Sequence, residues 1–284
     1  MEIKVLAPAK INLMLDVTGK RSDGYHTLIT IMQSISLADV VTISTCCDNL
    51  ITVTTDNASI PFGKKNIAYK AAEQFILHTG IQHNGFKIHI QKIIPSEAGL
   101  GGGSADAAAV LIGLNALFKT KLSIDTLCDI GVKIGADVPF CIKGGTKFCT
   151  GIGEVMTDTF PLENCYIVIS KGNSGISTKD AFKKIDAIDF EYSKKYTLYN
   201  GSVESVKQIG YNKFELVSEN TDVEFIKNKM FYMNALYSAM SGSGSAVFGL
   251  FFNKTDADKC AETLSAEGFF SELCFPITNG TIVI

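Results

Sequence analysis

A glycine-rich stretch in the first half of the chain sets tight limits on the local fold. It reads Pro95-Ser-Glu-Ala-Gly-Leu-Gly-Gly-Gly-Ser-Ala-Asp106, after a strand-like alternation at 86–90 and before an apolar, helix-like run that ends near residue 118. Glycine allows positive φ and a close approach of the backbone to a ligand, and Ser104 is placed to cap the helix. Free N–H groups at a helix start, aligned with the helix dipole, bind anions. The stretch therefore predicts a site for the phosphates of a nucleotide.

Other phosphate-binding loops do not fit the spacing of these glycines. The chain has neither G-x-x-x-x-G-K-[ST] nor G-x-G-x-x-G, so a Walker-type site and a dinucleotide fingerprint are excluded. The remaining alternative is a strand-to-helix connection that binds no ligand. A second cluster, Ser241-Gly-Ser-Gly-Ser245, either wraps a phosphate or forms a tight turn, and turn chemistry alone does not decide between the two.

Composition and charge exclude several classes of protein. The chain has 26 basic and 29 acidic side chains and a net charge of −3, whereas nucleic-acid-binding domains are usually basic. No apolar run approaches the roughly 20 residues of a membrane span, and Met1–Lys10 lacks the apolar core of a signal peptide. The eight cysteines are scattered and read as reduced thiols. We therefore expect a cytoplasmic protein with small-molecule ligands and no nucleic-acid or membrane partner, as a monomer or a homodimer.

The order of the predicted elements indicates an α+β protein with two domains. The first half combines strands of alternating polarity, such as 11–17, with helices that begin near Asn66, Ser104 and Ser123. We expect Gly135 and Pro139 to end the third of these helices. In the second half the pattern predicts strands at 166–170 and 246–252 and helices at 178–185 and 256–267. A length of 284 residues allows two domains, which we expect at 1–155 and 156–284.

A lysine and an aspartate outside the glycine-rich stretch are candidates for chemistry. Lys10 and Asn12 lie on one face of the first predicted strand, because side chains alternate along a strand. Asp137 follows the third predicted helix. Phosphoryl transfer needs positioning, charge neutralisation and one carboxylate beside the attacking hydroxyl. The plainer interpretation is a solvated lysine and a turn aspartate, and the linear sequence does not show whether the two side chains meet.

Three motifs together resemble those of the GHMP kinase superfamily, which includes galactokinase, homoserine kinase and mevalonate kinase. They are the glycine-rich stretch, the opening Pro8-Ala-Lys10 and the Ser241–Ser245 cluster. Further blocks resemble one branch of the superfamily, in the same order along the chain: Pro8-Ala-Lys-Ile-Asn-Leu13, Gly19-Lys-Arg-Ser-Asp-Gly-Tyr-His26, Ala98-Gly-Leu-Gly-Gly-Gly-Ser104, Gly135-Ala-Asp-Val-Pro-Phe140 and Gly144-Gly-Thr146. One departure is Asn212-Lys-Phe-Glu-Leu216, where the family often has Asn-Asp-x-Glu-Pro; we expect it to lie far from the catalytic motifs.

The resemblance implies a fold, a reaction and a set of nucleotide contacts. The implied fold is an N-terminal domain like ribosomal protein S5 domain 2 and a ferredoxin-like C-terminal domain. The implied activity is an ATP-dependent phosphorylation of an alcohol, with Lys10 and Asp137 as the catalytic pair and Mg²⁺ on the phosphates, where Ser104 is a candidate ligand. The implied ATP contacts are Asn66, Pro95, Ser96, Glu97, Ala98, Gly99, Leu100, Gly101, Gly102, Gly103, Ser104 and Ala105.

The same branch implies a substrate that carries a cytidine diphosphate group. Its alcohol is a methylated tetritol phosphorylated on the 2-hydroxyl, on the way to isoprenoid precursors. Tyr25 and His26 supply an aromatic face and an imidazole that can stack on a pyrimidine and bind its polar edge. By resemblance Asn12 joins this site, Phe182 closes the other face and Thr178 lies nearby. Without the family, Tyr25 and His26 are equally an ordinary loop pair, and Phe182 a core residue.

Two other functions compete with this interpretation. One is a different kinase of the superfamily, acting on a smaller alcohol such as homoserine or mevalonate. The other is a nucleotide-binding protein of the same fold that has no activity. An inactive relative would be expected to lose Lys10 or Asp137, and both are present.

Overall fold

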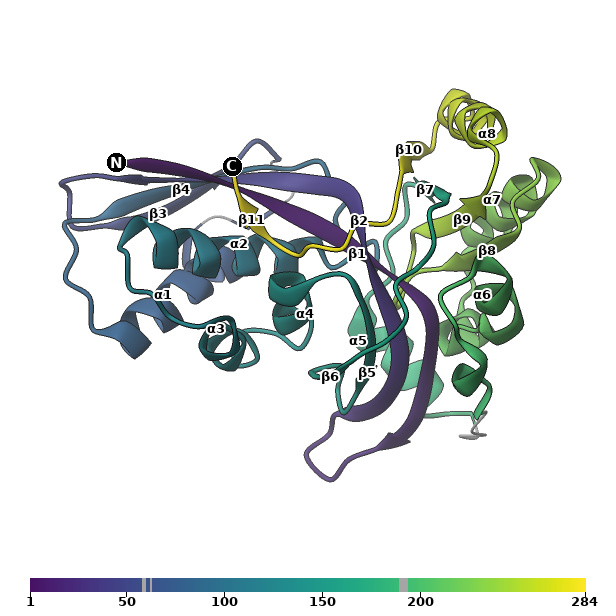
Figure 1. Cartoon of the computed structure of the whole chain (residues 1–284), viewed down its shortest axis with the longest axis horizontal. Coiled ribbons are helices and arrows are strands. Elements are labelled where there is room, and N and C mark those ends of the chain that lie inside the picture. The colour runs from purple at the N-terminus through teal and green to yellow at the C-terminus, as the bar shows by residue number, and fades with distance from the viewer. Residues whose placement is uncertain (58–59, 62, 189–193) are drawn as a thin grey trace.

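Two long antiparallel strands run through the molecule and join its two halves (Figure 1). They are β1 (Glu2–Lys20) and β2 (His26–Thr45). The structure, a computed structural model, describes residues 1–57, 60–61, 63–188 and 194–284. The pairing of β1 with β2 shifts register at three places, between Pro8 and Lys10, Asn12 and Met14, and Val17 and Gly19. Such bulges bend a strand and redirect its side chains, often beside a functional site.

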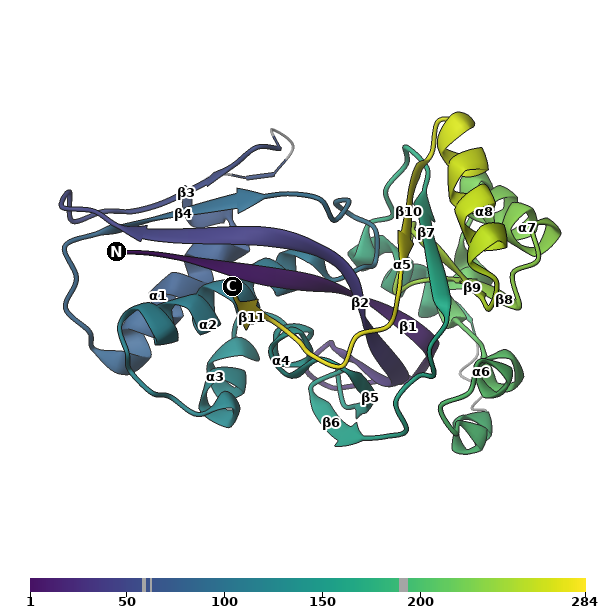
Figure 2. The same cartoon turned by 45° about the horizontal axis from the view of Figure 1, so that its top comes forward.

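The first half is a seven-stranded sheet with helices on one face (Figures 1 and 2). Its strands besides β1 and β2 are β3 (Ile51–Thr55), β4 (Phe86–Gln91), β5 (Thr146–Thr150), β6 (Val155–Asp158) and β11 (Ile282–Val283). The helices are η1 (Gly63–Lys65), α1 (Ile67–Thr79), α2 (Gly102–Leu117), α3 (Ile124–Gly131) and α4 (Val138–Lys143). The apolar face of the sheet and the alanine-rich α2 form the main core, as expected for apolar surface removed from water.

The helix ends explain where the sequence patterns succeeded and where they did not. The side chains of Asn66 and Ser123 accept hydrogen bonds from Ala68 N and Thr126 N, which confirms both predicted caps. The prediction that Ser104 caps the second helix was wrong, because Gly101 is the N-cap and α2 already begins at Gly102. Pro139 does not end a helix either; it lies in the first turn of α4, where its missing N–H is not needed.

The second half is a four-stranded antiparallel sheet in the order β10-β7-β9-β8. Its strands are β7 (Tyr166–Lys171), β8 (Tyr237–Met240), β9 (Val247–Phe251) and β10 (Phe270–Cys274). Its helices are α5 (Thr178–Ile185), η2 (Lys194–Leu198), α6 (Val203–Ile209), η3 (Lys213–Val217), α7 (Thr221–Tyr232) and α8 (Lys254–Ala266). Helices α7 and α8 lie on the side of this sheet away from the first half (Figure 2). The α+β class is confirmed.

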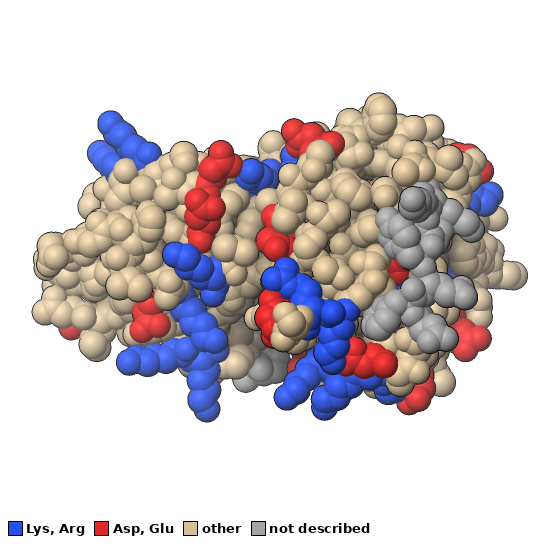
Figure 3. Space-filling view, turned by 90° about the horizontal axis from the view of Figure 1, so that it is seen from below, with Lys and Arg blue, Asp and Glu red and all other residues tan. Residues whose placement is uncertain are grey.

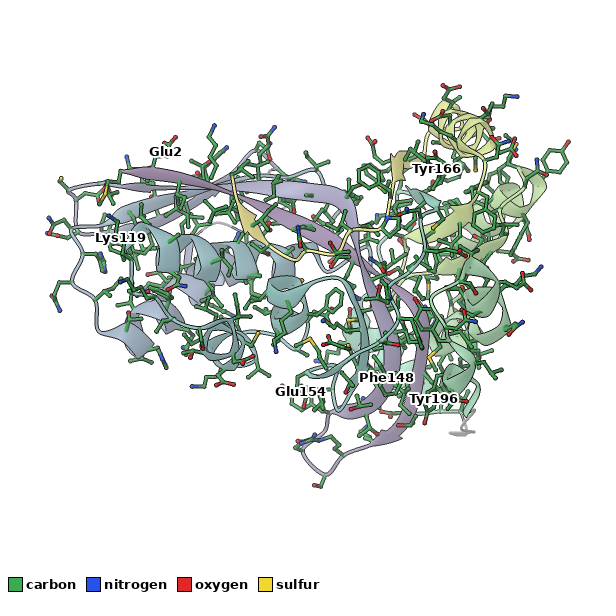
Figure 4. All side chains as sticks on the ribbon, viewed as in Figure 1. Glu2, Lys119, Phe148, Glu154, Tyr166 and Tyr196 are labelled. Carbon is green, nitrogen blue, oxygen red and sulfur yellow. The ribbon has the colours of Figure 1, made fainter. Side chains whose placement is uncertain are left out.

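Contacts distant in sequence hold the two halves together. The rings of Phe148 in β5 and Tyr196 in η2 stack with centroids 5.2 Å apart (Figure 4), and Leu15 N donates to Tyr211 O at 2.7 Å. Strand β11 returns to pair with β1, and β6 pairs with β5 in the first sheet. The expected boundary between 155 and 156 therefore falls inside β6, and it stays a prediction. No helix in the described residues is long and apolar enough to cross a membrane.

Candidate active site

A cleft of about 1060 Å³ lies between the two halves and is lined by residues of both. The first half contributes β1, the β1–β2 hairpin, the glycine-rich stretch and Asp137, and the second half contributes α5 and the Ser241–Ser245 loop. Basic side chains gather towards the middle of the face seen in Figure 3. Lys20, Lys65 and Lys179 are among the residues that line the cleft. Cations around a cleft favour anionic ligands such as nucleotides.

The glycine-rich stretch forms one wall of the cleft and touches β1. Gly99 and Gly101 have φ of 73° and 71°, so these two glycines are required by the backbone, while Gly102 and Gly103 are the first residues of α2. Lys10 N donates to Leu100 O at 3.0 Å. The loop therefore delivers the N-terminus of α2 to the cleft, as an anion site requires.

The Ser241–Ser245 loop packs directly against the glycine-rich stretch. Ser241 Oγ donates to Gly99 O at 3.0 Å, and Ala246 N donates to Ala98 O at 3.0 Å. The Asn212 amide donates to Met240 O at 2.7 Å and Gly242 O at 2.9 Å. The expectation that residues 212–216 lie far from the catalytic motifs was therefore wrong, because the fold brings Asn212 beneath this loop. Within the loop, Gly242 and Ser243 line the cleft.

We expect Gly99→Ala to weaken ATP binding by more than tenfold. A Cβ on Gly99 would stand 2.0 Å from Ser241 O, a backbone atom that cannot move away alone, and φ there is positive. The matched control is Gly80→Ala, which has φ of 63° and nothing within 4 Å of the added Cβ. That control should cost about 1–2 kcal/mol of stability through the left-handed backbone alone and leave ATP affinity unchanged. Equal ATP affinities for both variants by calorimetry would mean that the phosphates bind elsewhere.

Lys10 and Asp137 meet on the floor of the cleft. Lys10 Nζ lies 3.5 Å from Asp137 Oδ2; the lysine side chain is buried and the aspartate is 30% exposed. Lys10 Nζ also donates to Asn12 Oδ1 at 2.8 Å, and Asn12 Nδ2 donates to Thr30 Oγ1 at 2.8 Å. The stem of Lys10 passes beneath Gly101, 3.0 Å from where a Cβ would stand. A buried, oriented ammonium therefore lies between the glycine-rich stretch and a partly exposed carboxylate.

A second lysine lies beneath the glycine-rich stretch in a buried ion cluster. Lys92 Nζ lies 2.8 Å from Asp106 Oδ2 and contacts Asp39, whose Oδ1 accepts from Ile93 N and Ile94 N. Burial alone would lower the pKa of Lys92, but the charges of Asp106 and Asp39 outweigh it, and the pKa is raised. Burial, opposed by Lys92, raises the pKa of Asp106 to about 7. The cluster joins β2, the end of β4 and the first turns of α2.

The predicted pyrimidine-binding residues come from the β1–β2 hairpin and from α5. Tyr25 is 59% exposed, whereas His26 is buried and stacks on Phe182 with ring centroids 4.5 Å apart and planes at 17°. His26 Nε2 lies 2.7 Å from Asp186 Oδ1. Thr178 Oγ1 is 2.9 Å from Ser243 Oγ. Tyr25, His26, Phe182 and Thr178 all line the cleft. His26 covers one face of the Phe182 ring in this structure.

Most of the residues expected to hold ATP line the same cleft. They are Asn66, Pro95, Ser96, Glu97, Ala98, Gly99, Leu100, Gly101, Gly102, Gly103 and Ser104. Ala105 is fully buried in α2 and is not among the lining residues. Both polar atoms of the Asn66 amide are used locally, since Oδ1 caps α1 and Nδ2 donates to Pro61 O at 2.9 Å. Asn66 can therefore contact a ligand by van der Waals packing, while its amide group is already hydrogen-bonded within the protein.

The side-chain oxygens near the helix start are of the kind that Mg²⁺ prefers. The Ser104 hydroxyl lies beside Gly135, 3.8 Å from the position of an added Cβ there, and Asp137 is two residues further on. Mg²⁺ binds one or two protein oxygens and completes its octahedron with phosphates and water. Among the described residues there is no cluster of three or more His, Cys, Asp or Glu side chains suited to a metal. The Ser104 hydroxyl fits a metal that is held mainly by the phosphates of a nucleotide.

Sequence reasoning missed several residues of the site. Lys20 and Asp186 line the cleft and pair with each other at 2.5 Å. A signal for Asp186 was its spacing, because it follows Phe182 by one helical turn and so shares its face. A signal for Asp106 was a charged residue in the otherwise apolar first turns of α2, since a buried charge needs a partner. Nothing in the sequence identifies Lys92 and Asp39 as those partners.

Comparisons with known proteins agree with the geometry. The sequence models described as "GHMP kinases N terminal domain" and "GHMP kinases C terminal" match residues 66–145 and 196–269. The chain is 40% identical over 278 residues to the 4-diphosphocytidyl-2-C-methyl-D-erythritol kinase of Clostridium tetani, covering 93% of this chain and 96% of the relative. A crystal structure of 4-(cytidine 5′-diphospho)-2C-methyl-D-erythritol kinase superposes with a TM-score of 0.81 at 30% identity, covering 97% and 99% of the two chains. A homoserine kinase from Cytophaga hutchinsonii gives 0.76 at 20% identity, over 100% of this chain and 97% of its own, which is a likeness of fold.

Proposed function

The chain belongs to the GHMP kinase family, and from its relatives we propose that it is a 4-diphosphocytidyl-2-C-methyl-D-erythritol kinase. The reaction transfers the γ-phosphoryl group of ATP to the 2-hydroxyl of that alcohol and gives the 2-phosphate and ADP. This places it in the methylerythritol phosphate route to isoprenoid precursors. The relatives favour this substrate over homoserine or mevalonate, whose kinases share the fold at lower identity.

One observation supports the proposal: a single cleft is lined by the glycine-rich stretch, by Lys10 and Asp137, and by Tyr25, His26 and Phe182. The glycine-rich stretch and the start of α2 belong to the first half, and Phe182 comes from α5 in the second half. The Lys10–Asp137 pair lies on the floor of the same cleft. An alcohol linked to a cytidine diphosphate would extend from the pyrimidine site towards the catalytic pair and present its hydroxyl to the γ-phosphate.

Asp137 and Lys10 act together in the transfer. As the substrate oxygen bonds to the γ-phosphorus and the bond to the β-phosphate oxygen breaks, the hydroxyl proton passes to Asp137. Lys10, held by Asn12, lies 3.5 Å from the Asp137 carboxylate and offsets charge on the transferring group. Because the transition state of phosphoryl transfer is loose, the proton leaves late and positioning by Asp137 matters as much as basicity. The N–H groups at the start of α2 hold the phosphates.

We propose Mg²⁺ as the metal that accompanies ATP, with the Ser104 hydroxyl as its protein ligand. When bound, the metal neutralises phosphate charge. We also propose a cytoplasmic enzyme of two domains, near 1–155 and 156–284, that acts as a monomer or homodimer on small molecules. All eight cysteines are free, which supports the proposal of a cytoplasmic enzyme, because the cytoplasm keeps thiols reduced. Most of them are buried, and burial raises the pKa of Cys128 to about 11.

An activity assay tests the substrate assignment: the purified enzyme is given ATP, Mg²⁺ and each of the three alcohols in turn. We expect ADP release with 4-diphosphocytidyl-2-C-methyl-D-erythritol and much slower release with homoserine or mevalonate. Faster turnover of either smaller alcohol would overturn the substrate assignment. ATP binding with no turnover of any of the three would favour a non-catalytic nucleotide-binding protein.

Replacement of Tyr25 by alanine should weaken binding of the cytidylyl substrate alone. Stacking of one base on an aromatic ring is worth about 1–3 kcal/mol, so we expect KM to rise by about 5- to 150-fold. Because Tyr25 is 59% exposed, its loss should leave the melting temperature unchanged. The KM for ATP should stay constant; an equal rise for ATP would place Tyr25 at the other end of the cleft.

A further inference from the structure

Asp186 reaches from the end of α5 across the cleft to the β1–β2 hairpin. Its Oδ1 lies 2.7 Å from His26 Nε2, and its Oδ2 lies 2.5 Å from Lys20 Nζ. Phe182, one turn earlier on the same helix, stacks on the His26 ring. The imidazole is therefore held on its face by Phe182 and at Nε2 by a carboxylate, and Nδ1 is the ring nitrogen left for a ligand in the cleft.

The carboxylate decides which nitrogen of a neutral His26 carries the proton. An ionised carboxylate only accepts hydrogen bonds, and a neutral imidazole has one N–H and one lone pair. The hydrogen bonds from Lys20 and then His26 lower the pKa of Asp186, so it is ionised near neutral pH. The Nε2–H tautomer donates to Asp186, whereas the other tautomer would set two lone pairs against each other at 2.7 Å. Partners of this kind fix the tautomer of a histidine, and Nδ1 is then a hydrogen-bond acceptor.

An acceptor at Nδ1 distinguishes the two common pyrimidines. Cytosine has an exocyclic amine, a donor, where uracil has a carbonyl, an acceptor. An acceptor nitrogen pairs with the amine and opposes the carbonyl, so a site of this kind rejects the wrong base through an unpaired polar group. We propose that Asp186 is a positioning residue that makes the site select a cytidine over a uridine diphosphate ester, by holding His26 in the Nε2–H tautomer. This inference rests on the proposed function, since it assumes that the pyrimidine binds beside His26.

The test compares Asp186→Asn with Asp180→Asn, the same change on the same helix. Asp180 is 62% exposed and pairs with Lys183, away from His26. An asparagine at 186 either donates or accepts, so it no longer specifies the tautomer. We expect its preference for the cytidine over the uridine ester of the same alcohol, measured as the ratio of kcat/KM values, to fall about tenfold, mostly through KM. ATP KM should stay constant, and Asp180→Asn should behave as the wild type.

Two further measurements separate positioning from a merely structural contact. In protein labelled with ¹⁵N-histidine and held about two units above the ordinary imidazole pKa of ~6.5, the wild-type His26 signals should show Nε2–H alone, and Asp186→Asn a mixture. The His26→Gln protein assigns the signals. Asp186→Glu keeps a carboxylate and should retain the preference for cytidine. An unchanged tautomer, or an unchanged cytidine-to-uridine ratio in Asp186→Asn, would overturn the inference.

The outcome can be distinguished from a failure of the proposed function. Calorimetry measures the affinities for CDP and UDP directly, so it tests the base preference even if the protein catalyses no reaction. The proposed function would be contradicted if the wild type binds CDP more tightly than UDP but does not phosphorylate the cytidine ester. In that case, loss of the preference for CDP in Asp186→Asn would still support the role of Asp186. A wild type with no preference between CDP and UDP would overturn the inference.

Discussion

Asp137→Asn should cut kcat by about 10²–10⁴ while leaving folding and the affinity for both substrates nearly unchanged. Asparagine keeps the size of the side chain and one hydrogen-bond acceptor, but it neither takes a proton nor carries a negative charge. Loss of a general base has a cost of this size, or about 2.7–5.5 kcal/mol. Because Asp137 is partly exposed and caps α4 without a side-chain hydrogen bond, the change should not unfold the helix. Steady-state kinetics and calorimetry together measure the effect.

Lys10→Ala should cost a similar factor, and the double variant should be little slower than either single one. Lys10 and Asp137 lie 3.5 Å apart and act on the same proton and charge, so removal of one disables the other. Losses that multiply in the double variant would show that the two work independently, with Lys10 on the phosphates alone. A fully active Asp137→Asn enzyme would remove the carboxylate from the mechanism.

Lys92→Met should lower the free energy of unfolding by about 3–5 kcal/mol, although the proposed mechanism assigns Lys92 no step. Removal of one partner from a buried ion cluster leaves uncompensated charge, and that is the typical cost. Here it leaves Asp39 and Asp106 buried beside each other with no cation. Because Asp106 belongs to the first turns of α2, we also expect weaker ATP binding. Urea unfolding at neutral pH measures the stability.

The control for Lys92 is Lys254→Met, which breaks an exposed pair with Asp258 and should cost less than about 1 kcal/mol. The double variant Lys92→Met with Asp106→Asn should recover part of the loss, since one of the two stranded carboxylates is gone. The cluster would not be an electrostatic unit if the two substitutions simply add. In that case Asp106→Asn would lower the free energy of unfolding of the Lys92→Met protein by as much as it lowers that of the wild type.

Local chemistry explains which predictions the sequence supported. Asn66 and Ser123 cap helices as expected, because an N-cap depends on one side chain and the backbone two or three residues later. The helix 178–185 was predicted with its observed bounds for the same reason. Ser104 failed as a cap because Gly101, with φ of 71°, turns the chain three residues earlier, where the backbone lies close to the stem of Lys10.

The residue types and their order in the chain determined the α+β class, the glycine-rich stretch and the candidates Lys10, Asp137, Tyr25 and His26. Only the tertiary structure decided that Lys10 meets Asp137, that Ser241 braces Gly99 and that Asp186 holds His26. The first group depends on periodicity and on backbone preferences within a few residues. The second joins positions separated by 127, 142 and 160 residues. Such pairs are set by the docking of the two halves, and no local pattern of the sequence encodes which distant side chain will lie within hydrogen-bonding distance.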